Sequence, residues 1–410
     1  MFGERPMSDD LYMDAPEAAE ALGISVPTLY SYVSRKGLRS FAVPGTRRRR
    51  YWRADILALL ASFEPQGGEP PAPSTRITLL TATGTYYRGH DVVDLADRAS
   101  VEDVAALLWQ APADQIFTDR LPHAPPMLPA MLAALQDAPT LDRAMSMLPL
   151  IERANPRAFD LSPAGFAASG ADALRWLTAL ILGADAPSPA PVHRAIADTL
   201  GADLVFADLI RRALILIADH EFAATTHAVR AAASTGLTPY AAVLVGLVAA
   251  TGQKAKIQRY EAVRRLVLEI LGAADPAQPI ISRFRAGEDL AGFETLPMHR
   301  GGDRRAQALL SACRAGLVHD PLFQRLETAV GVVTDLTSRE PGVIVLLAFL
   351  GHRLGLAGNE LALGTIGRAI GWIAHAQEAM AEPMIGRSAR ASYDGPLPTG
   401  ALERGSGGGI

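Results

Sequence analysis

Helical spacing of apolar residues is the feature that most limits what this chain can fold into. Four segments keep an apolar face or are apolar all round: Asp103–Trp109, Ala171–Leu182, Leu204–Asp219 and Ile344–Leu354. Apolar residues that recur every three to four positions are typical of helices packed on a core. Strand signals are sparse by comparison. The sequence therefore predicts an all-α body with almost no sheet.

The clearest domain boundary is the segment PQGGEPPAPST, residues Pro65–Thr75, which is rich in proline and glycine and has no hydrophobic face. Such a segment is typical of a semi-extended linker. A chain of 410 residues is long enough for two or three domains. We expect a first domain over 1–64, a linker over 65–75, and a disordered glycine-rich tail over 397–410.

Composition indicates a globular protein that works inside the cell. Hydrophobic residues make up 49% of the chain and charged residues 20%. The single cysteine, Cys313, allows no intramolecular disulfide. The first ten residues contain no apolar segment of signal-peptide length, and the apolar run 241–250 is too short to span a bilayer. We expect a cytoplasmic protein with no membrane partner.

The first domain has the pattern of a helix-turn-helix. Asp14 can cap a helix over 15–22, Gly23 permits the turn, and Ser25 can cap a second helix over 26–34. Two strand-like runs then flank the turn at Pro44–Gly45, and a third helix is expected over 54–63. This arrangement resembles the winged helix-turn-helix of the MerR and excisionase type, so we expect double-stranded DNA as a partner.

The charge distribution supports this expectation, because residues 35–53 contain eight basic residues and no acidic one. The net charge of the chain is −4, so any nucleic-acid site must be such a local patch. Arginines on the hairpin would contact phosphates, whereas side chains of the second helix would reach base edges. The candidate DNA-contacting residues are Thr28, Tyr30, Ser31, Tyr32, Arg35, Lys36, Arg47, Arg48, Arg49 and Arg50. The alternatives are a solvated basic loop, or a hairpin that binds RNA or protein.

The remainder of the chain resembles the citrate synthase family. The resemblance is carried by YYRGHDVVDLADRASVEDVAALLW (86–109), HEFAATTHAVRAAAST (220–235) and IGRAIGWIAHA (366–376), and covers about 76–396. It implies a large helical domain over 76–219 and 336–396, a small helical domain over about 220–335, and a homodimer. It also implies acetyl-CoA or another acyl-CoA as substrate or ligand, with no tightly bound cofactor.

Members of this family condense an acyl-CoA with oxaloacetate, in the tricarboxylic acid or the methylcitrate cycle. The reaction needs an aspartate base and a histidine that stabilises the enol, held together in a closed site. The family's His-Glu pair is present as His220-Glu221. The family motif GPLHGGANEAV appears as GQKAKIQRYEAV (252–263), which puts Ala255 or Lys256 at its histidine. The motif GFGHPLYPDGDPRA appears as GFETLPMHRGGDRRA (292–306), with Thr295 or Leu296 at its histidine and His299 nearby.

The base aspartate is the most informative substitution. The family motif PNVDFALA appears without a gap as PGVIVLLA (341–348), so its aspartate falls on Ile344. An isoleucine cannot abstract a proton, and loss of a general base typically costs about 10² to 10⁴-fold in rate. The resemblance therefore implies that no catalytic group is intact.

Carboxylate-binding groups are retained in greater number. By the resemblance, Arg305, Arg368 and Arg390 fall where the family binds carboxylates, and His220 where it touches oxaloacetate. Together they would hold a small di- or tricarboxylate through charge-assisted bonds. Arg368 interrupts an apolar helix, where an unpaired charge is costly. The alternative for each arginine is an ordinary ion pair. Asp219 is expected only to orient a helix end, and His375 and His352 are given no role.

Three interpretations of the whole chain follow. The first is a DNA-binding regulator whose body senses a carboxylate or an acyl-CoA without condensing them. The second is an active citrate or 2-methylcitrate synthase with a rearranged site that uses Lys256 or His299. The third is a non-catalytic subunit that pairs with an active homologue. No metal-ligand spacing or phosphate-binding loop is present in the sequence.

Overall fold

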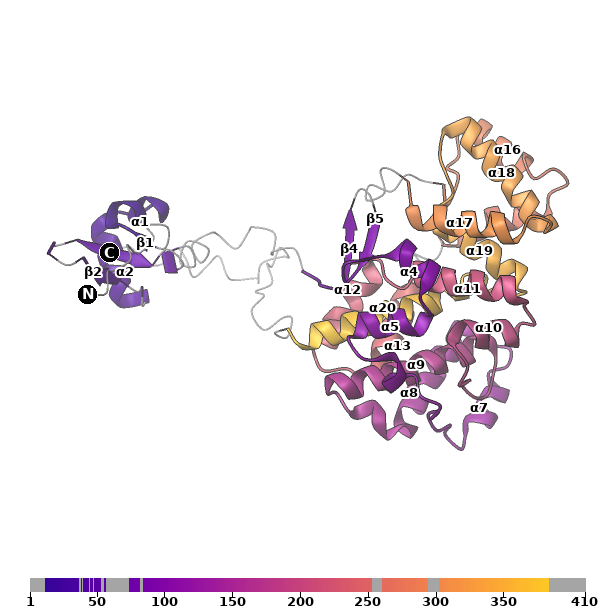
Figure 1. The fold of residues 1–410 in the computed structure, drawn as a ribbon, viewed down its shortest axis with the longest axis horizontal. Coiled ribbons are helices and arrows are strands. Elements are labelled where there is room, and N and C mark those ends of the chain that lie inside the picture. Colours follow the sequence, from indigo (N-terminus) through magenta and orange to yellow (C-terminus); the bar gives the residue numbers. More distant parts are fainter. Residues whose placement is uncertain are drawn as a thin grey trace, which may run out of the picture. The chain divides into compact units, whose positions relative to one another are not determined.

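The computed structural model has two compact units (Figure 1). The first unit spans Met1–Ser74 and the second begins at Thr75. The described residues are 12–36, 38, 40–43, 45–46, 48–52, 55–56, 74–81, 84–252, 260–293 and 302–382. The predicted tail over 397–410 lies outside them.

The first unit contains the two predicted helices, α1 (Ala15–Ala21) and α2 (Val26–Lys36). Asp14 and Glu17 form a reciprocal capping box at the start of α1, which satisfies two backbone N–H groups. Gly23 makes the turn with a φ of 63°, a left-handed conformation that a β-carbon disfavours. Ser25 accepts from Thr28 N at 3.4 Å at the start of α2. The predicted helix-turn-helix is confirmed.

The predicted hairpin is also present, as β2 (Ser40–Ala42) paired antiparallel with β3 (Arg49–Trp52). A short strand that the sequence did not predict, β1 (Tyr12–Met13), pairs with the other edge of β3. Of the predicted third helix, the described residues Asp55 and Ile56 are helical. The unit has a hydrophobic core of its own, which contains Met13, Ala18, Ala19, Leu22, Leu29, Leu38, Tyr51 and Ile56.

The second unit opens with a small antiparallel sheet, β4 (Thr78–Thr81), β5 (Gly84–Tyr87) and β6 (His90–Asp91), in the order β4-β5-β6. All other elements described in this unit are helical. The larger group of helices, in the lower part of the unit in Figure 1, comprises α4 (Val92–Arg98), α5 (Val101–Trp109), α6 (Ala113–Ile116), α7 (Leu128–Ala134), α8 (Thr140–Ala154), η2 (Pro156–Phe159), α9 (Pro163–Leu182), α10 (Val192–Thr199), α11 (Leu204–Leu216), α12 (Ala224–Ala233), α13 (Pro239–Ala250) and α20 (Ala362–Met380).

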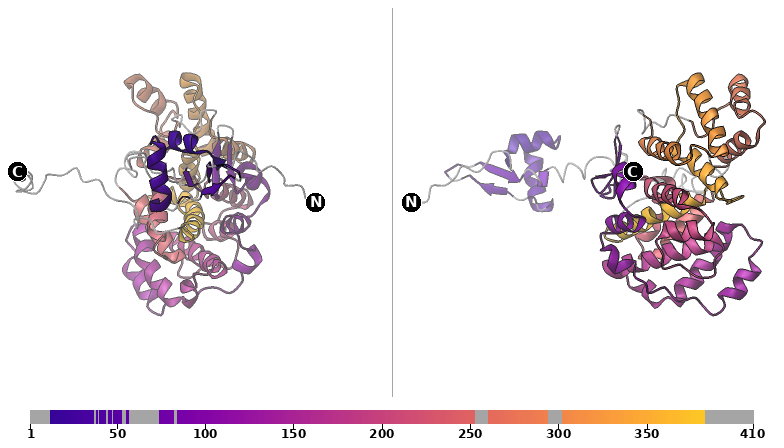
Figure 2. Two further views of the ribbon diagram at one scale, coloured as in Figure 1. Left: turned by 90° about the vertical axis from the view of Figure 1, so that its left-hand side faces the viewer. Right: turned by 45° about the vertical axis from the view of Figure 1, so that its right-hand side comes forward.

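A smaller group of helices stands above it in both turned views of Figure 2. It comprises α15 (Ala262–Gly272), α16 (Gln278–Ala286), α17 (Arg304–Gly316), α18 (Pro321–Thr337) and α19 (Val343–Arg353). Helices α17 and α19 join this group to α11 and α20 of the larger one. The four predicted apolar helices are confirmed as α5, α9, α11 and α19.

The packing of α12 and α13 bears on the expected domain division. Both helices fall after residue 219, where the small domain was expected to begin, yet they pack against each other and against α20 of the larger group. Helix α13 also packs against α8 and α9.

Within the described residues, no helix is both long enough and apolar enough to cross a membrane.

Helix α20 lies at the centre of the larger group, and two glycines let it approach the end of α11. A β-carbon on Gly367 would lie 2.6 Å from Ile217 Cγ2, and one on Gly371 would lie 2.4 Å from Ala218 O. Gly371 N donates to Ala218 O at 3.0 Å, so the two segments are bonded backbone to backbone. This contact places residues 217–220 directly against the polar side chains of α20.

Candidate functional site

Asp219 is the centre of a buried polar cluster at the end of α11. Its carboxylate has no solvent exposure. Oδ1 accepts from Arg368 NH1 at 3.0 Å, and Oδ2 accepts from Thr78 Oγ1 at 2.6 Å and from His375 Nε2 at 3.1 Å. Burial by itself raises the pKa of Asp219, but the Arg368 guanidinium and the bonds from His375 and Thr78 hold that pKa well below its usual range. Asp219 is therefore an anion in the folded protein.

The backbone around Asp219 is also held by hydrogen bonds. Tyr87 OH donates to Asp219 O at 3.1 Å and also lies 2.9 Å from Asp219 N, which can donate to it. Glu221 N donates to Asp219 Oδ2 at 3.1 Å, and Glu221 has a φ of 49°, in the left-handed region. Burial and the Asp219 charge raise the pKa of Glu221. We call Asp219, Thr78, Thr226, Arg368 and His375 the Asp219 cluster.

Arg368 is paired within the protein. Besides its bond to Asp219, Arg368 NH2 donates to Thr226 Oγ1 at 2.9 Å, and its side chain is 13% exposed. Asp219 supplies the counter-charge that an arginine inside an apolar helix needs, so Arg368 forms an ion pair within the protein. A ligand carboxylate at Arg368 would share or replace Asp219 as its partner.

His375 is held between Asp219 and a second arginine. Arg230 NH1 lies 3.2 Å from His375 Nδ1, and an arginine nitrogen can only donate. This assigns an acceptor role to Nδ1 and the ring hydrogen to Nε2, which then donates to Asp219. The ring is fully buried and lies beside Phe222 at a centroid distance of 5.8 Å. No role was predicted for His375, and the structure adds it to the Asp219 cluster.

Arg305 and His220, both predicted to bind ligand, contact each other beside this cluster. Arg305 NH1 lies 3.2 Å from His220 Nδ1, while Nε and NH2 each donate to Asp303 at 2.9 Å. By the same reasoning Nδ1 of His220 accepts, and the hydrogen is on Nε2. Arg305 is only 3% exposed. It is therefore placed to orient the imidazole ring of His220.

Ile344, which the sequence comparison predicts to stand at the family's aspartate position, lies in the first turn of α19. Its side chain is partly buried and packs against the hydrophobic core of the second unit. The other positions predicted to be substituted, Ala255, Lys256, Thr295 and Leu296, lie outside the described residues, as do His299 and the predicted ligand residue Arg390.

One sequence signal could have revealed the cluster. Arg368 and His375 are seven residues apart on a mainly apolar helix, which places both on one face. Polar side chains on a buried helix face need hydrogen-bond partners inside the protein. Asp219, which precedes the predicted ligand residue His220, is an acidic residue that could be such a partner. Thr78 and Thr226 carry no comparable signal, because their hydroxyl groups become important only when β4 and α12 pack beside Asp219.

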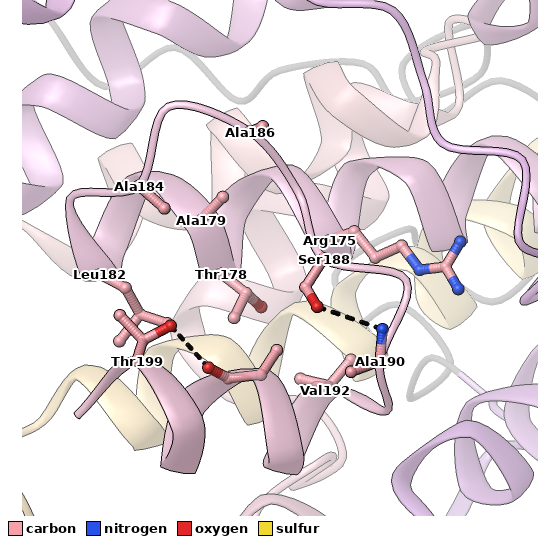
Figure 3. A pocket seen from close by; sticks show the side chains of 11 residues that line it. Arg175, Thr178, Ala179, Leu182, Ala184, Ala186, Ser188, Ala190, Val192 and Thr199 are labelled. Atoms are coloured by element: carbon pink, nitrogen blue, oxygen red, sulfur yellow. Dashed lines mark hydrogen bonds between the residues drawn. The ribbon is translucent and has the colours of Figure 1, made fainter. Parts of the chain in front are cut away.

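The two cavities that stand out are separate from the Asp219 cluster. A cavity of about 40 Å³ lies between α9, the loop 184–190 and α10, with the Ser188 and Thr199 hydroxyls in its wall (Figure 3). It has room for a few water molecules and no more. A cavity of about 490 Å³ is lined by Asp203, Phe206, residues 315–320 and Arg353. It lies at the start of α11, about 20 Å along this helix from Asp219.

The predicted DNA-contacting side chains differ in how they are engaged. Tyr30 is 53% exposed on α2. Thr28 Oγ1 lies 2.8 Å from Ser25 Oγ, and Ser31 Oγ donates to Thr28 O at 2.8 Å, so these two hydroxyls make local bonds. Arg49 Nε donates to Ser40 Oγ at 3.1 Å across the hairpin, whereas the Arg48 side chain is exposed.

The remaining predicted DNA contacts are only partly described. Arg50 is partly buried on β3. The side chains of Tyr32, Arg35 and Lys36, and all of Arg47, lie outside the described part. No group of three or more His, Cys, Asp or Glu residues able to hold a metal ion occurs among the described residues.

The second unit has the mostly helical architecture of citrate synthases. The citrate synthase from Pyrobaculum aerophilum superimposes with a TM-score of 0.66 at 19% identity, covering 89% of this chain and 97% of that one. The citrate synthase from Thermoplasma acidophilum, in a ternary complex with carboxymethyl coenzyme A and oxaloacetate, gives a TM-score of 0.64 at 20% identity. That match covers 80% of this chain and 95% of that one.

The family models that match the sequence agree with this architecture. The model of the citrate synthase C-terminal domain matches residues 70–389, and that of a helix-turn-helix domain matches residues 12–63. The chain belongs to the citrate synthase family and carries a helix-turn-helix domain before the family domain. Two relatives, both 2-methylcitrate synthases from strains of Mycobacterium tuberculosis, are 28% identical over 325 residues, covering 71% of this chain and 80% of each relative.

Proposed function

We propose that this protein is a DNA-binding regulator whose citrate-synthase-like body binds a small di- or tricarboxylate without condensing it with an acyl-CoA. The observation that carries the proposal is Ile344, which stands where the family motif has its base aspartate and packs against the core. Without a base, a bound acyl-CoA would not be deprotonated. Binding needs no such group, because guanidinium and imidazole donors suffice to hold a carboxylate.

In this proposal the ligand contacts Arg368 and His220. Arg368 supplies the cation and the Nε2–H of His220 donates to the ligand, while Arg305 orients His220 from within the protein. Arg390 is proposed as a further carboxylate contact. The body is proposed to be a homodimer in the cytoplasm and to accept acetyl-CoA or another acyl-CoA as a possible second ligand.

In this proposal the helix-turn-helix domain binds the DNA. A fold with its own core, an exposed Tyr30 on α2 and a hairpin bearing Arg48–Arg50 fits a duplex-binding module. The proposal assigns phosphate contacts to the basic residues of the α2 end and the hairpin, and base contacts to Thr28, Tyr30, Ser31 and Tyr32.

Two binding measurements on the full chain test the proposal. Citrate or oxaloacetate should raise the melting temperature, since a ligand at a hundredfold excess over its Kd stabilises the folded state by about 2.7 kcal/mol. Arg368→Ala should abolish that rise, whereas Arg353→Ala, at an exposed arginine paired with Asp320, should retain it. A labelled duplex should bind at low salt. If neither carboxylate shifts the melting temperature, or if no duplex binds, the proposal is wrong.

An active 2-methylcitrate or citrate synthase is the second candidate. The specific observation in its favour is the 28% identity to the two 2-methylcitrate synthases. It requires a base from another position, for which Lys256 and His299 are the candidates. An assay of CoA release separates the two candidates directly.

A further inference from the structure

The segment that leads out of the linker is bonded to the Asp219 cluster. Thr78, the first residue of β4, donates its hydroxyl to Asp219 Oδ2 at 2.6 Å. Three residues earlier, Thr75 Oγ1 donates to Glu378 Oε2 at 2.8 Å, and Arg76 N donates to Glu378 Oε1 at the same distance. Residues 75–78 are therefore fixed to the body through side chains at both ends.

These two attachment points belong to one buried network. Arg230 NH1 lies 2.5 Å from Glu378 Oε2 and 3.2 Å from His375 Nδ1, and His375 Nε2 lies 3.1 Å from Asp219 Oδ2. A path of hydrogen bonds thus runs from Arg368 through Asp219, His375, Arg230 and Glu378 to Thr75. Arg230 and His375 are 5% and 0% exposed, so these two side chains interact in a low-dielectric interior where hydrogen bonds are stronger than in water.

Each carboxylate along this path lies beside an arginine. Burial raises the pKa of Glu378, but the bonds from Arg76 N, Arg230 and Thr75 outweigh it and lower that pKa overall. Glu378 and Asp219 are therefore both anions, each beside an arginine. Phe222 covers the middle of the path, with the Arg230 guanidinium 5.2 Å from its ring centroid. Arg230 also pairs with Glu382, at 2.6 Å, just before the C-terminal segment begins.

We propose that residues 75–78 couple carboxylate binding at Arg368 to DNA binding by the helix-turn-helix domain, through this network of Asp219, His375, Arg230 and Glu378. The inference rests on the function proposed above and specifies its regulation. A ligand carboxylate competes with Asp219 for Arg368. Asp219 then depends on Thr78 and His375 as donors, so the bonds that fix residues 75–78 differ between the free and the bound protein.

A coupling between two binding sites can be measured as a change in affinity, and the change must be the same in both directions. Coupling free energies between two sites typically correspond to about a 5- to 150-fold change in affinity. If citrate changes the Kd for a duplex by some factor, the duplex must change the Kd for citrate by the same factor. The experiment measures both quantities on the full chain, using a labelled duplex of mixed sequence and citrate, at constant ionic strength because citrate itself contributes salt.

The test variants are Thr75→Val and Glu378→Gln, which break the path at its far end and leave Arg368 and His220 in place. Thr199→Val is the matched control, because the Thr199 hydroxyl bonds to Ala195 O on α10, away from the path. We expect a change of about fivefold or more in duplex Kd on adding citrate to the wild type and to Thr199→Val. In Thr75→Val and Glu378→Gln the change should fall below twofold, while the rise in melting temperature with citrate persists.

Two results would overturn the inference, and they are distinguishable from failure of the proposed function. If the wild type binds both citrate and the duplex but neither changes the Kd of the other, the coupling does not exist. If Thr75→Val and Glu378→Gln both couple as strongly as the wild type, the path does not carry it. If citrate leaves the melting temperature of the wild type unchanged, the proposed carboxylate site fails, and the coupling fails with it.

Discussion

At the scale of single residues, Asp219 and Arg368 determine what the site can bind. An anion with no solvent exposure is tolerable only with strong donors, and Arg368, His375, Thr78 and the backbone of Glu221 provide them. The protein thus already holds one carboxylate at the cation that a ligand would use. This arrangement favours a ligand with more than one carboxylate, because the ligand must compete with the Asp219 carboxylate for Arg368.

Removal of the cation should be far more damaging here than at the surface. Arg368→Gln leaves Asp219 buried without its counter-charge, so we expect a loss of about 3–5 kcal/mol in the free energy of unfolding. Arg314→Gln removes an arginine that is 54% exposed and paired with Glu327, so it should cost about 0–1 kcal/mol. Chemical denaturation of both variants measures the difference, and equal losses would contradict the assignment of Arg368 to a buried pair.

The low pKa of Asp219 predicts the pH dependence of stability. A carboxyl whose pKa is lowered by folding stabilises the protein above its unfolded pKa of about 4, and this contribution is lost as the pH falls toward the folded value. The difference in unfolding free energy between the wild type and Asp219→Asn should therefore be constant from about pH 7 to 5 and shrink below about pH 4. A difference that grows on acidification would show that Asp219 is not the stabilising anion.

At the scale of elements, the position of α20 depends on glycines at 367 and 371. A β-carbon on Gly371 would lie 2.4 Å from Ala218 O and 2.5 Å from Asp219 Oδ1, distances that require backbone or cluster to move. Helix α20 thus brings Arg368 and His375 to Asp219 only because its facing turn carries no side chain. The site is a consequence of how closely two helical segments pack.

The helix substitution Gly371→Ala should therefore destabilise the protein and weaken carboxylate binding, because it displaces Asp219. Gly331→Ala is the matched control, since Gly331 lies in α18 and a β-carbon there meets nothing within 4 Å. The control should be neutral or up to about 1 kcal/mol more stable, from the better helix propensity of alanine. Thermal melts with and without citrate measure both effects, and an unchanged Gly371→Ala protein would refute the close-packing argument.

The sequence predicted the elements of this fold better than the contacts of its site. Apolar periodicity located α5, α9, α11 and α19, and capping residues located α1 and α2. Helical spacing cannot show which helices meet, so the Arg368–Asp219 pair and the role of His375 were not predicted. The strands β1 and β4–β6 were missed because two to four residues are too short for a period-two pattern to register.

At the scale of the whole molecule, a helix-turn-helix domain and a citrate synthase family domain are joined in one chain. Affinity of the helix-turn-helix domain for DNA should fall steeply with salt, because phosphate contacts release counterions. Arg48→Ala should weaken binding to all duplexes alike and reduce the slope of log K against log salt by about 0.9. Tyr30→Ala should instead change the preference among sequences. Fluorescence anisotropy over a salt series measures both, and salt-independent binding would exclude the phosphate contacts.

The measurement that bears most directly on the whole account is CoA release from acetyl-CoA or propionyl-CoA with oxaloacetate, on the full chain in a preparation whose melting temperature rises with citrate. With Ile344 at the base position, we expect release at the rate of the protein-free control while the citrate-dependent rise persists. Turnover within tenfold of the ordinary enzyme median of about 10 per second would contradict the account. It would show that the chain is a synthase with a base at another position.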